Sequence, residues 1–258
     1  MSNPTYREAV LGLAEKLCDN AVRMIMEVEL KVEAHGAADY KMVACALCGR
    51  SLANFKGVRL MVEEGLIIEA RTLVRACYEN MFFIAKLTSD GPAFVDKMLE
   101  DEIASRLKRA KFVLATSELL EGLLEETRKN LREYSEKAKT NFPKAKVLSP
   151  KSVSEDGPLS QAYLVYSQLS AEAAHPSFSS LTRHFSRIEE NGKEIRVFDI
   201  QPVPRDTDLD RTLYLGCTAL LGVLVGTSQI LGDTLAGKEL WGLLDEYTAL
   251  GKTRVAAE

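Results

Sequence analysis

The stretch TLYLGCTALLGVLVGTSQIL, from Thr212 to Leu231, carries no charged side chain. Its length suits either a helix that crosses a membrane or the central helix of a bundle. Gly222 and Gly226 lie four residues apart, a spacing that lets neighbouring helices approach closely in either setting. Threonines, Ser228 and Gln229 interrupt the apolar run, and aspartates lie close to both of its ends. We therefore expect the central helix of a bundle, with no stable membrane insertion.

Helical patterns also dominate the chain on either side of this stretch, and capping residues, glycines and prolines divide them into separate helices. We expect an all-α protein, a multi-helix antiparallel bundle forming one domain over residues 1–258, with a helical pair in 1–65 and the core bundle in 66–258. The stretch from Asn141 to Pro158 is expected to be a loop. The expected helices cover Pro4–Ala34 with Asn3 as its cap, Asp39–Glu64, Leu66–Leu87, two segments within Pro92–Lys139, a segment from Leu159 to His175, a segment from Thr207 to Leu231, and Lys238–Leu250.

One segment departs from the helical pattern. Glu190-Asn191-Gly192-Lys193 is typical of a tight turn between antiparallel strands. The flanking segments His184–Ile188 and Ile195–Ile200 have the composition of short strands. The sequence therefore predicts one short β-hairpin near residues 184–200.

The composition narrows the possible locations and partners. The formal net charge is −4, so no global positive field draws the chain to nucleic acid or to anionic lipid. The polar segment Met1–Glu8 lacks the basic-then-apolar order of a signal peptide. The five cysteines are odd in number and lie in apolar helical contexts, which favours reduced, buried thiols over disulfides. We expect a cytoplasmic protein.

Three charged residues lie on one face of the apolar helix expected at Leu66–Leu87. Arg71, Arg75 and Glu79 follow one another at intervals of four residues. Charges on a central helix are costly unless they are paired. An arginine four residues before a glutamate is the less favourable order for a simple pair, which indicates partners on another helix. The pattern fits either a buried ion-pair network that fixes helix register or a functional polar pocket.

A second polar group precedes Pro176. Tyr163, Tyr166 and Ser170 fall on one helical stripe, and Glu172 and His175 fall on a neighbouring one. Proline disfavours helical geometry at the preceding residue, so we expect the helix to end or kink at His175. The helix dipole favours imidazolium at such a C-terminus. His175 could then bind an anion or act as a general acid/base, or it could cap carbonyls that Pro176 leaves unpaired.

Metal and redox chemistry have weaker support. Glu172-x-x-His175 has the spacing of carboxylate-bridged di-iron bundles, but the other two histidines supply no second such motif. Cys45-x-x-Cys48 lies in mid-helix without a second cysteine pair. The sequence also contains no glycine-rich phosphate loop and no nucleophile-elbow motif. We expect no metal and no cofactor.

Basic residues gather between Arg128 and Lys151, interleaved with Tyr134 and Phe142. Glutamates lie within this run and directly before it. The run fits a solvated helix of mixed charge, or a local patch that steers RNA or DNA.

Two segments together carry a resemblance. Glu69-Ala70-Arg71-x-x-x-Arg75-x-x-x-Glu79 is followed about ninety residues later by Tyr163-x-x-Tyr166-x-x-Leu169-Ser170-x-x-x-x-His175-Pro176-Ser177. This combination resembles an uncharacterised family of helical proteins found mostly in bacteria, a domain of unknown function. The match runs from about Leu66 to Arg187. More distantly, the layout is similar to the HEPN superfamily of helical, often dimeric bundles, which includes many metal-independent ribonucleases of toxin and phage-defence systems.

The HEPN ribonuclease motif is incomplete in this chain. The signature is an arginine followed after four to six residues by a histidine. His175 holds the comparable place, but Tyr166 to Ala171 contain no arginine, and Arg183-His184 has its two residues adjacent. The resemblance leaves Arg71 or Arg75 as the arginine that would substitute in space.

The resemblance implies a HEPN-like protein that binds or cleaves RNA or binds a nucleotide. In the catalytic version, His175 is the general acid/base of a metal-independent ribonuclease, and Arg71 and Arg75 hold phosphate or stabilise developing charge. Supporting roles in the pocket fall to Glu79, which orients Arg75, and to Tyr163, Tyr166, Ser170 and Glu172. The alternative is a non-catalytic, dimeric module that binds a ligand or a protein. A homodimer is expected in both cases.

Overall fold

The computed structural model describes residues 5–29, 38–116, 125–155, 159–174, 176–190, 192–232 and 234–255. Within these residues the fold is all-α apart from one two-stranded antiparallel sheet, as the sequence predicts. The elements are α1 (Tyr6–Met26), α2 (Tyr40–Glu63), α3 (Ile67–Asp90), α4 (Pro92–Thr116), α5 (Glu125–Asn141), α6 (Pro150–Glu155), α7 (Ala162–Leu169), the π-helix η2 (Ser170–Ala174), α8 (Phe178–Leu181), the 3₁₀-helix η3 (Thr182–His184), β1 (Phe185–Glu190), β2 (Lys193–Phe198), α9 (Asp206–Leu231) and α10 (Leu235–Val255).

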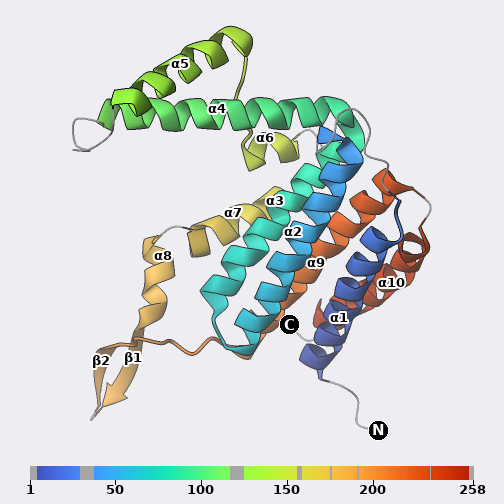
Figure 1. The fold of residues 1–258 in the computed structure, drawn as a ribbon. Helices are drawn as coiled ribbons and strands as arrows, with labels where there is room; N and C mark the ends of the chain where they lie inside the picture. The colour runs from blue at the N-terminus through green and yellow to red at the C-terminus, as the bar shows by residue number, and fades with distance from the viewer. Residues whose placement is uncertain are drawn as a thin grey trace.

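The centre of the bundle is a group of three long helices, α2, α3 and α9 (Figure 1). Three glycines of α9 face the other two, and a Cβ added at Gly216 would lie 2.8 Å from the ring of Phe55 on α2. A Cβ at Gly222 would lie 2.6 Å from the sulfur of Met81 on α3. The glycines of α9 therefore let the helix backbones approach closely, as expected from their spacing.

Helix α9 is also, among the described residues, the one helix long and apolar enough to cross a membrane by length and composition. Within its most apolar window, 61% of the residues are buried inside the protein. The hydrophobic core gathers around it, drawing side chains from α1, α2, α3 and α10. The expectation that this segment is a central bundle helix is confirmed.

The bounds of the first helix differ from the expected ones. Helix α1 begins at Tyr6, because Thr5 and Glu8 form a capping box in which each side chain accepts a hydrogen bond from the other residue's backbone. It ends at Met26, and Glu27 to Glu29 are not helical, so within the described residues the predicted helix is too long at both ends. The predicted cap Asn3, Pro4 and residues 30–34 lie outside the described residues. By contrast, α2 begins after Asp39, whose carboxylate accepts backbone hydrogen bonds at the N-terminus, and ends just before Gly65, as predicted.

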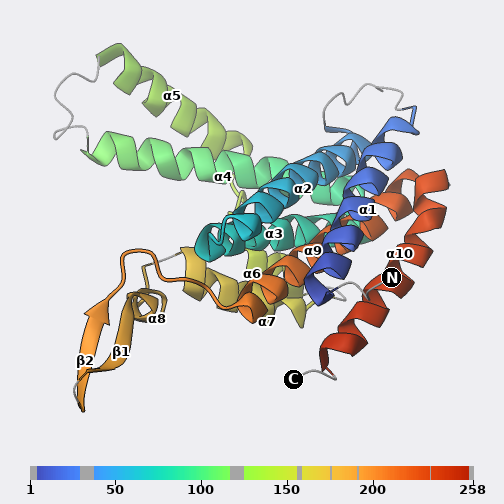
Figure 2. The same ribbon diagram turned by 90° about the horizontal axis from the view of Figure 1, so that it is seen from below.

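Helices α4 and α5 pack on each other and extend away from the central helices, as both views show (Figures 1 and 2). Helix α3 continues to Asp90, beyond the predicted end at Leu87. Gly91 then has a φ of 56° and α4 begins at Pro92, where the sequence predicts the next helix. The loop expected from Asn141 to Pro158 is partly wrong, since residues 150–155 form α6, which packs on α3. A serine cap at Ser149 and a proline in the first turn are the local signals for this short helix.

The hairpin lies at the other side of the molecule, beyond α8 (Figures 1 and 2). Strands β1 and β2 pair antiparallel with Phe185 opposite Phe198 and Glu190 opposite Lys193. Gly192 has a φ of 73°, which the tight turn between the strands requires. The predicted hairpin is therefore confirmed, with the predicted turn.

All five cysteines are free, and Cys18, Cys48, Cys77 and Cys217 are buried. Burial raises the pKa of the Cys48 thiol to about 12 and also raises the pKa of Cys45. The thiolate is the nucleophilic form of cysteine, so the Cys45-x-x-Cys48 pair lacks the lowered pKa that redox chemistry requires.

Candidate functional site

Arg75 of α3 lies in a closed polar network with α7 and η2. Its Nε donates a hydrogen bond of 2.8 Å to Ser170 Oγ, and Nη2 donates one of 2.5 Å to the hydroxyl of Tyr166. The same Nη2 lies 3.0 Å from Glu79 Oε1. The Tyr166 hydroxyl in turn donates to Glu79 Oε1 over 2.8 Å. Arg75 therefore pairs with Glu79 on its own helix and also contacts Tyr166 and Ser170 outside it. The charged face of α3 indicated such partners on another helix.

Aromatic side chains enclose this network. The ring of Tyr163 stacks on that of Tyr166 with centroids 5.6 Å apart, and Phe82 packs edge-on against Tyr166. The Arg75 guanidinium carbon lies 4.8 Å from the centre of the Tyr166 ring, within cation–π range. Burial, and then the hydrogen bond to Glu79, raise the pKa of Tyr166 to about 12. Tyr166 therefore stays a neutral donor at physiological pH.

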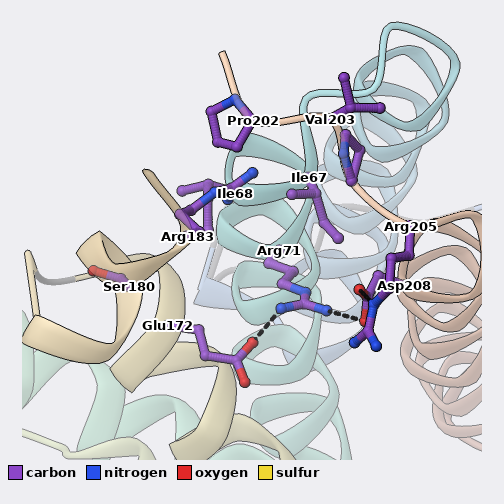
Figure 3. A pocket seen from close by; sticks show the side chains of 11 residues that line it. Ile67, Ile68, Arg71, Glu172, Ser180, Arg183, Pro202, Val203, Arg205 and Asp208 are labelled. Atoms are coloured by element: carbon purple, nitrogen blue, oxygen red, sulfur yellow. Dashed lines mark hydrogen bonds and ion pairs between the residues drawn. The ribbon is translucent and has the colours of Figure 1, made fainter. Parts of the chain in front are cut away.

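Arg71, one turn earlier on α3, lies between two carboxylates. Its Nη1 is 2.5 Å from Glu172 of η2, and its Nη2 is 3.6 Å from Asp208 of α9. Its Nε donates to Thr212 over 3.3 Å. Figure 3 shows the guanidinium held between the two acids. The side chain of Arg71 thus joins α3, η2 and α9, although these segments are far apart in sequence.

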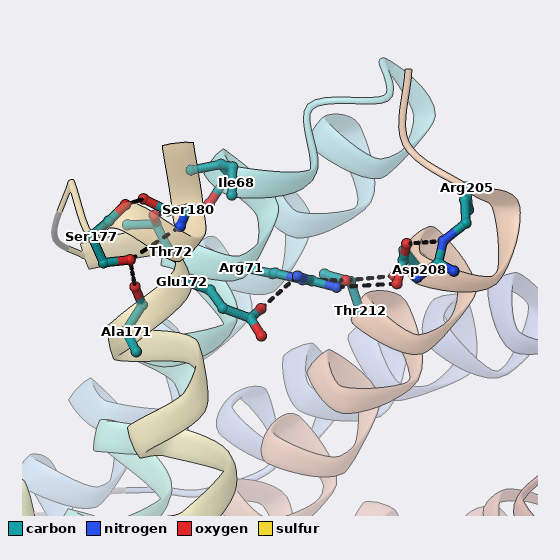
Figure 4. A network of polar contacts seen from close by, with 10 residues as sticks. All are labelled: Ile68, Arg71, Thr72, Ala171, Glu172, Ser177, Ser180, Arg205, Asp208 and Thr212. Atoms are coloured by element: carbon teal, nitrogen blue, oxygen red, sulfur yellow. Dashed lines mark hydrogen bonds and ion pairs between the residues drawn. The ribbon is translucent and has the colours of Figure 1, made fainter. Parts of the chain in front are cut away.

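The π-helical segment η2 supplies contacts to both arginines. Ser170 begins the segment and accepts from Arg75, while Glu172 pairs with Arg71. Wider π-helical turns are found frequently at functional sites. Beyond η2, Ser177 donates to the carbonyl of Ala171 and accepts from the backbone of Ser180, which fixes the start of α8 beside η2 (Figure 4).

An open cavity of about 360 Å³ lies on the side of Arg71 away from Arg75. Arginines from three separate segments line it, namely Arg71 of α3, Arg183 of η3 and Arg205 at the start of α9, together with Glu172 and Asp208 (Figure 3). We call it the arginine cavity. The rest of its lining consists of Ile67, Ile68, Ser180, Pro202, Val203 and Pro204.

The three arginines are not equally engaged. Arg71 is mostly buried and has two acidic partners, while Arg205 is largely exposed and pairs with Asp208 over 2.9 Å. Arg183 is half-buried, and no carboxylate in the described part of the chain pairs with it. Its charge is therefore the one most available to a bound anion.

His184 lies beside Arg183 and lines the neighbouring hollow, which continues over the start of α3. Its Nδ1 is 2.8 Å from the backbone carbonyl oxygen of Asp199. Because a carbonyl oxygen only accepts, Nδ1 is the donor in this hydrogen bond. The ring stacks on Phe198 with centroids 5.9 Å apart. His184 therefore links this neighbouring hollow to the root of the hairpin.

The structure separates the sequence-predicted site residues into two groups. Glu79, Tyr163, Tyr166 and Ser170 gather around Arg75, and Glu172 joins Arg71 at the edge of the cavity. His175 lies outside the described residues. The contributions of Arg183, Arg205 and Asp208 were not predicted from the sequence. The adjacent Arg183-His184 pair was the only local signal, and its order matched no motif.

The described residues include no group of three or more His, Cys, Asp or Glu side chains placed to hold a metal ion. The arginine cavity instead offers guanidinium groups, which donate hydrogen bonds in a planar fork suited to carboxylate or phosphate. The cavity lining thus combines three guanidinium groups, two of them paired with carboxylates, with an apolar wall.

The fold and the cavity define an all-α bundle with an open, arginine-lined site at the junction of α3, η2, η3 and α9. Residues 41–194, more than half of the chain, match the model of a family of unknown function, DUF5677, and the chain belongs to that family. The matched region includes both segments that carry the sequence resemblance, around Arg71 and around Tyr166. No curated protein and no solved structure matches the chain.

Proposed function

We propose that this protein binds RNA or a nucleotide through phosphate, and that the arginine cavity is the binding site. The observation that carries the proposal is the convergence of Arg71, Arg183 and Arg205 on one cavity, from three segments of a chain whose net charge is −4. Arginine matches the geometry of phosphate oxygens and is the preferred side chain for bidentate phosphate recognition.

The shape of the cavity supports a ligand with both an anionic and an apolar part. Ligand sites are typically concave, largely apolar and fitted with a few polar groups that fix orientation. Ile67, Val203 and Pro202 offer apolar surface on which a base or ribose could pack, and the arginines offer donors to phosphate. The distant resemblance to HEPN proteins, which include RNA-directed members, points to the same class of ligand.

Cleavage of RNA would be the catalytic form of this proposal, with His175 as general acid/base and no metal ion. Arg75 already donates to Ser170 and Tyr166 and pairs with Glu79, so Arg71 is the better placed arginine to meet a phosphate. The test is incubation of wild type and His175→Ala with total RNA and tRNA in excess chelator. Cleavage that disappears in a folded His175→Ala protein supports catalysis. If the RNA stays intact with both proteins, the catalytic form of the proposal is excluded for these substrates.

Binding is tested by fluorescence anisotropy with a labelled single-stranded RNA, with competition by unlabelled nucleotides. Wild type should bind with an affinity that falls as salt rises, because phosphate contacts release counterions. Arg183→Gln should weaken binding by about tenfold, the loss of one charge-assisted contact to phosphate.

The matched control is Arg109→Gln, an exposed arginine on α4. It should bind RNA as wild type does. A larger loss with Arg109→Gln than with Arg183→Gln would move the site to helices α4 and α5. Absence of binding by wild type at millimolar nucleotide and at low salt would refute the proposal.

The second candidate is a non-catalytic, dimeric module in the cytoplasm. The exposed hairpin favours it, because its aromatic side chains are open to solvent beside α8. The two candidates make different demands on the arginine cavity, since a module that binds a protein or an uncharged ligand needs no phosphate at Arg183. The anisotropy measurement therefore separates them.

A further inference from the structure

The β1–β2 hairpin carries an unusual amount of exposed apolar surface. Every residue of β1 is exposed, as is every residue of β2 except Val197. Phe185 and Phe198 are 56% and 62% exposed, and Phe178 of the adjacent α8 is 82% exposed. An isolated two-stranded hairpin is at best marginally stable in water, so a partner that covers this surface would stabilise it.

One face of the hairpin has a regular order of side chains. Residues directly opposite each other share a face, and so do residues two apart along a strand. Three rungs therefore lie in a row on one face, running from the root of the hairpin toward its turn. They are Phe185 opposite Phe198, Arg187 opposite Arg196, and Glu189 opposite Glu194.

Two of these rungs place like charges directly opposite each other, an arrangement that destabilises a sheet. A diagonal ion pair of 2.9 Å between Arg187 and Glu194 relieves part of this cost. No ion pair engages Arg196 or Glu189 within the described part of the chain. An arginine rung next to a glutamate rung is therefore incompletely neutralised by the hairpin itself.

The charge balance favours a protein over a nucleic acid as the partner of this surface. Residues 185–198 contain Arg187, Lys193 and Arg196 against Glu189, Glu190 and Glu194, so the formal charges cancel. Nucleic-acid affinity depends on net positive charge near the phosphates. Aromatic residues and arginine are, in contrast, the side chains enriched in the cores of protein interfaces.

We propose that this face of the hairpin binds the same face of a second copy of the chain. A two-fold axis that crosses the strands between the two charged rungs brings each arginine rung over the glutamate rung of the other copy. Arg187 then lies opposite Glu189 of the partner subunit, and Arg196 lies opposite Glu194 of the partner subunit. The pattern is self-complementary, and the phenylalanines at the root supply apolar surface beside the charges. This interface does not depend on phosphate binding in the arginine cavity.

The test is a charge exchange in the full chain, followed by sedimentation over a concentration series. Arg196→Glu places two glutamates opposite each other across the interface, and Glu194→Arg places two arginines there. Each should weaken self-association by at least about tenfold, because each repulsion occurs twice in a symmetric dimer. Within the hairpin, each change converts a like-charge rung into an opposite-charge rung. Glu194→Arg also removes the diagonal pair with Arg187, so its new pair with Glu189 replaces an ion pair, whereas Arg196→Glu adds one. Neither change should unfold the hairpin.

Two combinations complete the test. An equimolar mixture of Arg196→Glu and Glu194→Arg should form a heterodimer, and the double variant Arg196→Glu/Glu194→Arg should again form a homodimer. Both results are expected only if these two residues face each other across subunits. The proposal is overturned if wild type is monomeric at all concentrations, as it would be if the hairpin binds RNA or an unrelated protein. It is equally overturned if the single variants dimerise as wild type does, or if neither combination restores association.

Discussion

Arg71 and Arg75 are one turn apart on α3, yet their surroundings differ. Arg75 is enclosed by Tyr166, Ser170 and Glu79, and its charge is used inside the protein. Arg71 also has acidic partners, but it lies at the wall of an open cavity that Arg183 and Arg205 share. One face of one helix thus supports a stabilising network at one turn and borders a candidate binding site at the turn before it. The sequence left two alternatives for this face, a structural network and a functional pocket, and each describes a different turn of α3.

The largest expected effect on stability comes from breaking the closed network. Arg75→Ala removes two hydrogen bonds and an ion pair and leaves Glu79 half-buried without its cation. We expect a loss of about 2–3 kcal/mol in the free energy of unfolding, measured by chemical denaturation. The control is Arg106→Ala, which removes an exposed pair with Glu102 and should cost less than about 0.5 kcal/mol. Equal stability of the two variants would contradict a structural role for Arg75.

A smaller loss is expected from Tyr166→Phe, which removes only the hydroxyl that links Arg75 to Glu79. The direct Arg75–Glu79 contact remains, so the cost should be about 1 kcal/mol at neutral pH. The pKa of Tyr166 is raised from its ordinary value near 10 to about 12, so between these values only the unfolded chain loses the proton. The stability that the hydroxyl contributes is complete below pH 10 and is lost as the pH rises toward 12.

Denaturation curves at a series of alkaline pH values check this sign. Wild type should lose stability more steeply than Tyr166→Phe above pH 10, so the difference between them should shrink. Other buried groups with raised pKa values, such as Tyr78, contribute equally to both proteins. A difference that stays constant up to pH 12 would show that Tyr166 does not hold its proton through this network.

Arg71→Gln is expected to combine a stability effect with a binding effect. Its partner Glu172 is 43% exposed, so water can replace much of that ion pair, and the loss should be about 1 kcal/mol. Binding of labelled RNA should also weaken, because the glutamine removes a charge from the cavity. Thermal denaturation and anisotropy on the same preparation measure both. A fully stable variant with normal RNA binding would show that Arg71 neither stabilises the fold nor contributes to binding in the arginine cavity.

Much of the bundle could be predicted from sequence because its signals are local. Asp39 caps α2, Gly91-Pro92 divides α3 from α4, and the turn at Gly192 specifies the hairpin. The first helix was misjudged because the capping box of Thr5 and Glu8 begins it later than Pro4 suggested. Helix α6 was missed because three prolines and several serines around it have the composition of a loop.

The candidate site was only partly predictable for a different reason. The spacing of Arg71, Arg75 and Glu79 indicated partners on another helix, and these exist in α7, η2 and α9. Arg183 comes from η3, which precedes the hairpin in the chain. Arg205 reaches the cavity because the segment from Asp199 to Arg205 returns the chain from the hairpin to the start of α9 (Figure 1). No periodicity in the sequence encodes that path, so their convergence with Arg71 required the fold.

The central claim is that Arg75 serves the fold and Arg183 serves a ligand. It is tested most directly by measuring unfolding free energy and RNA affinity together for Arg75→Gln and Arg183→Gln. We predict that Arg75→Gln loses stability while the folded protein binds RNA as wild type does. Arg183→Gln should keep its stability within about 0.5 kcal/mol and lose about tenfold in affinity. Normal binding by Arg183→Gln, or lost binding by folded Arg75→Gln, would contradict the account.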